Sequence, residues 1–197
     1  MALLHRGSVL QARSSPMPFD SWPEQDTPEP QPPPHSHALR IGRFSQAGMP
    51  YFLTSNVDGR KPLLDNIARE TVIESLLWAR AQGRIWLLGY MILDDHFHTL
   101  IILRDQATLA LFTDGLKRHT ARQINKRLGQ TGTFWQESYH DHAIRDESDL
   151  WHHVHYMHAN PVRRGWVGKP EDYSWSSAHA SRLADLDWDK VGYSESQ

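Results

Sequence analysis

The sequence of 197 residues contains no cysteine. The chain therefore has no disulfide, no thiolate metal ligand and no cysteine nucleophile, which fits a reducing compartment, and we expect a cytoplasmic protein. No apolar run approaches the ~20 residues that a transmembrane helix needs. The N-terminus also lacks the continuous apolar core of a secretory signal. These absences predict a chain with no membrane partner, whose chemistry depends on residues other than cysteine.

An overall basic excess is also lacking, since the formal net charge is -2 at pH 7, and this alone argues against a nucleic-acid partner. The acids are concentrated at the ends: residues 1–37 and residues 181–197 each carry four acids and two bases. Of the 21 bases and 23 acids, 17 and 15 remain in the middle. One stretch there, residues 116–132, has no acid but holds five bases, which indicates a solvated helix face or a phosphate-binding surface: Lys117, Arg118, Arg122, Lys126 and Arg127.

Proline divides the chain into regions. Eight prolines fall within residues 14–37, where they remove backbone donors and leave little apolar mass to bury. We therefore predict a disordered proline-rich tail over residues 1–40 and one globular domain over residues 41–180. Residues 181–197 are short and acidic, and we predict a peripheral C-terminal tail.

Within the domain, apolar patterning predicts an alternation of strands and helices. Strands are expected over 51–57, 85–93, 96–103 and 138–144, and helices over 65–82, 108–128 and 146–159. The last helix is expected to end at Asn160-Pro161, because a residue before proline is disfavoured in helical conformation. The first six elements have the order of a ferredoxin-like unit, so the predicted fold class is α+β: an antiparallel sheet with packed helices and an additional C-terminal helix.

Histidine is abundant, with 13 residues, and the spacing His-x-His occurs four times. Side chains at i and i+2 point to the same side on a strand but not on a helix. His96 and His98 lie on a strongly apolar strand, with Phe97 facing the other way. Two imidazoles on one sheet face can hold a divalent metal ion, although two hydrogen-bonded histidines at a strand end fit the same pattern. The other pairs lie in the proline-rich tail, on a more polar strand and on a helix: His35/His37, His140/His142 and His153/His155.

The predicted last helix carries a tyrosine in a polar row. Leu150, Val154 and Met157 form its apolar stripe, whereas Tyr156 falls with His152 and Asn160 on what we interpret as the opposite side. An exposed surface tyrosine and a nucleophile both fit this position. A phenol can attack a phosphodiester when a metal ion neutralises the phosphate oxygens, and Asn160 can add an oxygen ligand to two imidazole nitrogens.

Longer motifs carry a resemblance to a known family. The motif HFH at residues 96–98 is followed by WQESYHDHAIR at 135–145, HHVHYMHANPVRRGWV at 152–167 and YSWSS at 173–177. In combination they resemble the REP-associated tyrosine transposases of the HUH single-tyrosine superfamily, over about residues 48–180. Asp94-Asp95 departs from the proline and polar residue that relatives often carry there.

The resemblance implies a ferredoxin-like fold and cleavage of single-stranded DNA beside hairpins through a 5′-phosphotyrosine, without a nucleotide cofactor. It implies that Tyr156 is the nucleophile and that His96, His98 and Asn160 hold a divalent metal, Mg or Mn. In this context we interpret the basic block, with Arg163 and Arg164, as a DNA-binding surface. Two alternatives remain: a non-catalytic hairpin-binding module, and a metal hydrolase that activates water, with Glu137 as its base. Whether the protein is a monomer or a dimer is left open.

Overall fold

The computed structural model describes residues 45–104 and 108–191, so the predicted tail over residues 1–40 lies outside the described residues. Four strands form one antiparallel sheet in the order β2-β3-β1-β4. They are β1 (Pro50–Asn56), β2 (Ile85–Ile92), β3 (His96–Leu103) and β4 (His140–Ala143). The α+β class and the ferredoxin-like order are as predicted.

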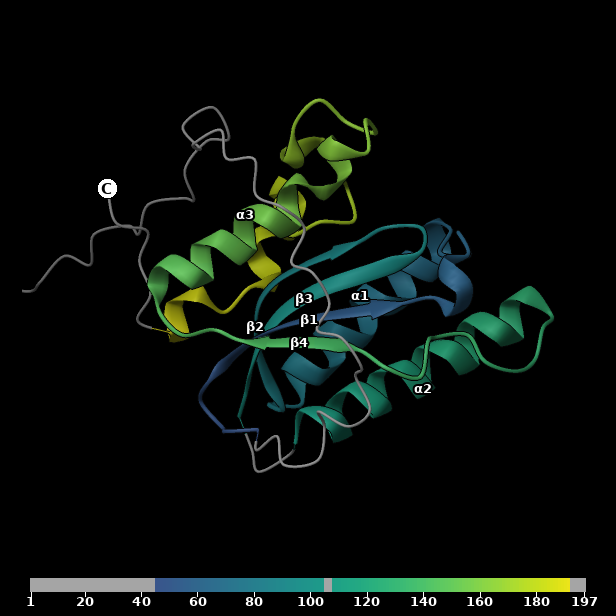
Figure 1. The fold of residues 1–197 in the computed structure, drawn as a ribbon, viewed down its shortest axis with the longest axis horizontal. Coiled ribbons are helices and arrows are strands. Elements are labelled where there is room, and N and C mark those ends of the chain that lie inside the picture. Colours follow the sequence, from purple (N-terminus) through teal and green to yellow (C-terminus); the bar gives the residue numbers. More distant parts are fainter. Residues whose placement is uncertain (1–44, 105–107, 192–197) are drawn as a thin grey trace, which may run out of the picture.

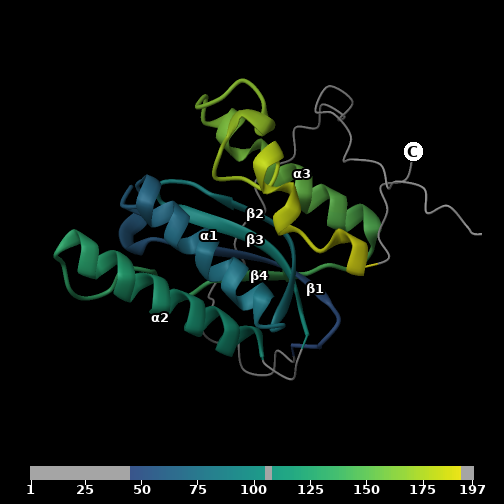
Figure 2. The same cartoon turned by 180° about the vertical axis from the view of Figure 1, so that it is seen from behind.

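The two faces of the sheet are covered by different helices (Figures 1 and 2). α1 (Asn66–Ala81) and α2 (Leu109–Leu128) cover one face, and α3 (Glu147–Arg163) covers the other. Asp65 caps α1 by accepting from the Ala68 N–H at 2.9 Å, and Gly129 ends α2 in a left-handed conformation. In the described part of the chain, no helix is both long and apolar enough to cross a membrane.

The last helix is longer than predicted, because α3 runs through Pro161 to Arg163. Proline has no N–H to offer the carbonyl of Met157, four residues earlier. The Asn160 side-chain nitrogen lies 3.5 Å from that carbonyl and 2.9 Å from the Tyr156 carbonyl, and Arg163 also donates to the latter at 2.8 Å. These side chains satisfy the backbone acceptors around the proline, so the helix does not end there.

The segment after residue 180 is not peripheral, contrary to the sequence interpretation. Residues 180–185 and 188–190 form short 3-10 helices. The buried Asp187 pairs with Arg80 at 2.9 Å and accepts from the Leu87 N–H at 3.1 Å. Tyr90 donates to Asp185 at 2.6 Å, and Val191 is buried. The folded domain therefore extends to at least residue 191.

Candidate active site

His96 and His98 lie side by side on the face of β3 that α3 covers. Their exposed fractions are 5% and 3%, and their ring centroids are 4.9 Å apart. Phe97 points to the opposite face and packs edge-on against Trp135 at 5.2 Å. Alternation along a strand, as predicted, thus directs both imidazoles to one side.

The two nitrogens of His98 have different surroundings. Nδ1 lies 2.8 Å from the Thr54 hydroxyl oxygen on the neighbouring strand, whereas the buried Nε2 has no hydrogen-bond partner. Burial, together with the nearby His96, moves the pKa of His98 well below its usual range, so the ring is neutral. A buried nitrogen without a partner is costly, and a neutral imidazole held through its other nitrogen is suited to bind a metal. His98 therefore fits the metal ion that the resemblance implies.

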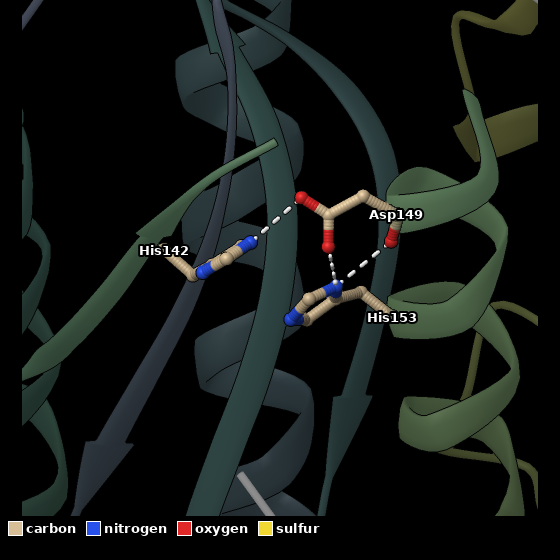
Figure 3. A group of neighbouring side chains, drawn as sticks. All are labelled: His142, Asp149 and His153. Atoms are coloured by element: carbon tan, nitrogen blue, oxygen red, sulfur yellow. Dashed lines mark hydrogen bonds and ion pairs between the residues drawn. The ribbon is translucent and has the colours of Figure 1, made fainter. Parts of the chain in front are cut away.

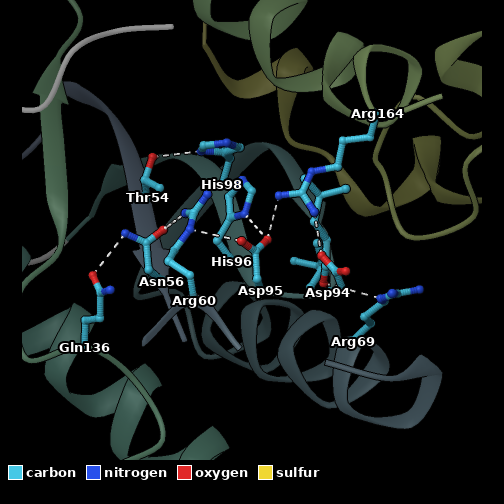
Figure 4. A network of polar contacts seen from close by, with 12 residues as sticks. Thr54, Asn56, Arg60, Arg69, Asp94, Asp95, His96, His98, Gln136 and Arg164 are labelled. Atoms are coloured by element: carbon cyan, nitrogen blue, oxygen red, sulfur yellow. Dashed lines mark hydrogen bonds and ion pairs between the residues drawn. The ribbon is translucent and has the colours of Figure 1, made fainter. Parts of the chain in front are cut away.

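Asp95 holds His96 in place (Figure 4). Its carboxylate lies 2.6 Å from Nδ1 of His96 and also pairs with Arg60 at 3.0 Å and Arg164 at 2.8 Å. Burial tends to raise the pKa of this carboxyl, but His96 and the two guanidiniums together hold it below its usual range. A carboxylate that accepts from Nδ1 leaves the Nε2 lone pair available for a metal.

Tyr156 lies against this pair and is buried, which corrects the interpretation that it points away from the core side of its helix. Its exposed fraction is 5%, and its ring meets His98 edge-on at a centroid distance of 5.7 Å. Leu150, Val154 and Met157 are buried as predicted, but so are other residues around the helix. At 100° per residue the buried arc spans about 200°, and Tyr156 lies at its edge.

Two further predicted residues are close to the tyrosine. The Arg163 guanidinium lies 4.4 Å from the centroid of the Tyr156 ring. Because the side-chain nitrogen of Asn160 donates to the Tyr156 carbonyl, the amide oxygen is directed away from the helix backbone. Arg164 pairs with Asp94 at 2.6 Å and with Asp95, next to His96. α3 thus brings the tyrosine and both arginines to the histidine pair.

The basic block divides into three groups. Lys117 is buried and donates to three backbone carbonyls, those of Gln136, Glu137 and Ser138, so unlike the prediction its ammonium faces the interior. Arg127 is exposed but forms a two-pronged pair with Asp65 at 2.7 and 2.9 Å. The remaining three bases are exposed on α2: Arg118, Arg122 and Lys126.

Sequence reasoning missed the residues that support the histidines. Thr54, Arg60 and Asp95 hold or surround His96 and His98, yet only Asp95 gave a signal, as the acid directly before His96. Glu137, the base considered for a water-activating hydrolase, has an exposed side chain.

The chain is similar in sequence to known proteins. The family model described as "Transposase IS200 like" matches residues 46–160. A REP-associated tyrosine transposase of Escherichia coli (strain K12) is 26% identical over 152 residues, which are 74% of this chain and 88% of the relative. A putative REP-associated tyrosine transposase of Haemophilus influenzae is 33% identical over 110 residues, covering 49% of this chain and 62% of the relative.

A solved structure of a REP-associated tyrosine transposase bound to a REP hairpin shares the fold. Its TM-score is 0.58 at 24% identity, and the match covers 78% of this chain and 90% of that chain. The predicted fold class and the predicted resemblance to REP-associated tyrosine transposases are both confirmed.

Proposed function

The chain belongs to the family of IS200-like transposases, and on that basis we propose that it is a metal-dependent single-stranded DNA endonuclease and strand transferase. One observation carries the proposal. The ring of Tyr156, on α3, lies 5.7 Å from the ring of His98, on β3. The buried Nε2 of His98 has no hydrogen-bond partner. A nucleophile and a metal ligand next to each other suit attack on a phosphodiester better than they suit a binding module.

We assign the metal site to His96, His98 and Asn160, with Mg²⁺ or Mn²⁺ as the ion. Two nitrogens and one amide oxygen leave positions for phosphate and water. When bound, the ion supplies positive charge that neutralises the non-bridging phosphate oxygens and orients the phosphate.

In the proposed reaction, the Tyr156 oxygen forms a bond to the scissile phosphorus and the phenol loses its proton. The bond from phosphorus to the 3′ oxygen breaks, and that oxygen takes a proton to become a 3′-hydroxyl. The DNA on the 3′ side stays joined to Tyr156 as a 5′-phosphotyrosine. Arg163, over the tyrosine ring, favours the negative charge that develops on the phenol and phosphate oxygens.

The covalent bond to tyrosine retains the energy of the phosphodiester. A 3′-hydroxyl of another strand can therefore attack it and rejoin the DNA without a nucleotide cofactor. We propose single-stranded, REP-like hairpins as the substrate, since a protein of the same fold has been solved bound to a REP hairpin. Arg118, Arg122, Lys126, Arg163 and Arg164 are the proposed phosphate contacts.

The test uses single-stranded hairpin oligonucleotides from DNA flanking the gene, labelled at either end and incubated with Mn²⁺ or Mg²⁺. The fragment that lies 3′ of the cut is expected to migrate as a denaturation-resistant protein adduct, and the other fragment is expected to end in a free hydroxyl. Tyr156→Phe is expected to bind the hairpin but form no adduct.

Tyr139→Phe serves as the matched control, because it removes a hydroxyl from another tyrosine of the domain. It is expected to form the adduct as the unmodified protein does. Cleavage by Tyr156→Phe with both fragments free would indicate a water-activating hydrolase, and hairpin binding with no cleavage by the unmodified protein would indicate a binding module. An adduct on the 5′ fragment would overturn the proposed polarity.

A further inference from the structure

A second cluster of potential metal ligands lies between the edge strand β4 and helix α3 (Figure 3). His142 is on β4, and Asp149 and His153 are on α3. One Asp149 carboxylate oxygen lies 2.8 Å from Nε2 of His142, and the other lies 3.2 Å from Nδ1 of His153, which also hydrogen-bonds to the Asp149 backbone carbonyl at 2.8 Å. One ligand atom from each residue lies within 4.8 Å of the other two.

This cluster is separate from the histidine pair of the candidate active site. The ring of Phe52, on β1, stacks on His98 at 5.2 Å and also contacts His153 at 4.8 Å. Both groups therefore pack on this apolar ring, and they have no donor residue in common. Tyr156 is three residues after His153 on the same helix, so α3 carries residues of both sites.

The donor set suits a borderline transition metal. Two imidazole nitrogens and one carboxylate form a common site for Zn²⁺, with the fourth position open to water. Although burial opposes it, the hydrogen bonds from His142 and from the Arg145 backbone keep the pKa of Asp149 below its usual range, and burial lowers the pKa of His153. The carboxylate is therefore charged and His153 is neutral, which are the forms that bind metals.

The carboxylate of Asp149 contacts both imidazoles, so the three side chains lie close together before any ion binds. The imidazoles of His142 and His153 are now stacked, with centroids 4.4 Å apart and planes 19° apart. Lone pairs lie in the ring planes, so the rings must turn toward one another for their nitrogens to share an ion. His142 is partly exposed and can make this movement, whereas His153 is buried.

We propose that His142, Asp149 and His153 form a second, structural metal site that takes a divalent transition-metal ion such as Zn²⁺. The ion joins the edge strand β4 to helix α3 and so fixes the helix that carries Tyr156. This proposal is independent of the proposed DNA chemistry, because none of its three residues is the proposed nucleophile, a metal ligand of the first site or a phosphate contact.

The test measures metal binding by the full chain in a His96→Ala/His98→Ala background, which removes the first site. Titration with Co²⁺, a spectroscopic substitute for Zn²⁺, is expected to give one bound equivalent with the intense visible absorption of a four-coordinate N/O site. Zn²⁺ is expected to displace the Co²⁺ and to raise the unfolding temperature. Neither readout depends on cleavage, so failure here differs from failure of the proposed function.

In this background, Asp149→Asn is expected to weaken metal binding at least about 100-fold, since replacing a residue that only supports a metal ligand already lowers metal affinity 10–100-fold. If Asp149→Asn folds poorly, His142→Ala is expected to give the same loss. Asp141→Asn, which alters a neighbouring acid on β4, is expected to keep the site. Absence of a bound equivalent in the His96→Ala/His98→Ala background would overturn the proposal. Binding that survives both Asp149→Asn and His142→Ala would also overturn it, because the ion would then be elsewhere.

Discussion

The imidazole of His98 meets the ring of Tyr156 edge-on, with 5.7 Å between the centroids and 69° between the planes. One residue lies on a central strand and the other on the helix that covers it, so this relationship depends on the packing of α3 against the sheet. The contact also explains why Tyr156 is buried: the ring fills the space beside His98 and Phe52.

The histidine pair provides the first prediction. His96→Ala and His98→Ala are each expected to lower metal-dependent cleavage at least about 100-fold, since each removes a proposed direct ligand. His155→Ala, on α3 but outside both clusters, is expected to stay within a few fold of the unmodified protein. Cleavage rates at saturating hairpin and varied Mn²⁺ provide the measurement. Full activity and unchanged metal dependence in either alanine variant would remove that histidine from the site.

Asp95 is predicted to act as a positioning residue for His96. Asp95→Asn keeps the size of the side chain but removes the charge that orients His96 and anchors Arg164. We expect the Mn²⁺ concentration for half-maximal cleavage to rise about 10–100-fold, as for other partners of metal-bound histidines.

Asp94→Asn is the matched control for Asp95, because both carboxylates pair with Arg164, whereas Asp95 is the one that contacts Nδ1 of His96. Its metal requirement is expected to stay near that of the unmodified protein. If the two asparagine variants shift the requirement equally, the effect comes from Arg164 and not from orientation of His96.

The exposed bases of α2 are predicted to contact the DNA backbone. Replacing Arg118, Arg122 and Lys126 together by glutamine should weaken hairpin binding and flatten its salt dependence by about 0.7 in the log–log slope for each lost contact. Binding measured at several salt concentrations gives this slope. An unchanged slope would identify the helix as an ordinary solvated face.

Lys117→Met provides a contrasting result for the same helix. Because the Lys117 ammonium serves three backbone carbonyls inside the fold, its loss is expected to reduce the free energy of unfolding by about 1–3 kcal/mol. The salt slope of hairpin binding should not change. Urea unfolding and the binding series together separate the two roles.

The buried His158 is predicted to make stability depend on pH. Its Nε2 lies 2.9 Å from the Ser177 hydroxyl oxygen, and burial lowers its pKa from 6.5 to about 3. The folded state keeps this ring neutral, so the contribution of His158 to the free energy of unfolding is complete above pH 6.5. Below that pH the unfolded chain binds a proton that the folded chain does not, and the contribution falls until about pH 3.

At about 1.4 kcal/mol for each pH unit, His158 should account for a loss of about 2 kcal/mol between pH 7 and pH 5. Between pH 7 and pH 5, the His158→Gln variant is therefore expected to lose about 2 kcal/mol less of its free energy of unfolding, measured with urea, than the unmodified protein. His119→Gln, on the exposed side of α2, is expected to behave like the unmodified protein. Equal losses in all three proteins would show that His158 does not titrate as described.

Much of the fold can be predicted from the sequence because its signals are local. Strand alternation alone places His96 and His98 on one face and Phe97 on the other, and the apolar patterning predicts the order of all seven main elements. The motifs around HFH and NPV were sufficient to indicate the transposase family. The stripe of Leu150, Val154 and Met157 is also buried as expected.

The tertiary structure decided which segments pack beside each element. The spacing of apolar residues in the sequence carries no information about these contacts. Helix α3 lies between the sheet and the C-terminal segment, so its buried arc is wide enough to include Tyr156. Lys117 reads as a surface base in sequence, yet the loop before β4 brings three carbonyls to its ammonium.

The same holds for polar partners that are distant in sequence. Arg164, which directly follows α3, reaches Asp95 in the turn between β2 and β3, 69 residues away in sequence. His142 and Asp149 are only seven residues apart, but they meet because β4 adds to the edge of the sheet beside β1. Local sequence determines which way a side chain points along its own strand or helix. The charge, carbonyl or ring that it contacts depends on how elements distant in sequence pack together. This packing offsets the conformational entropy that the chain loses on folding.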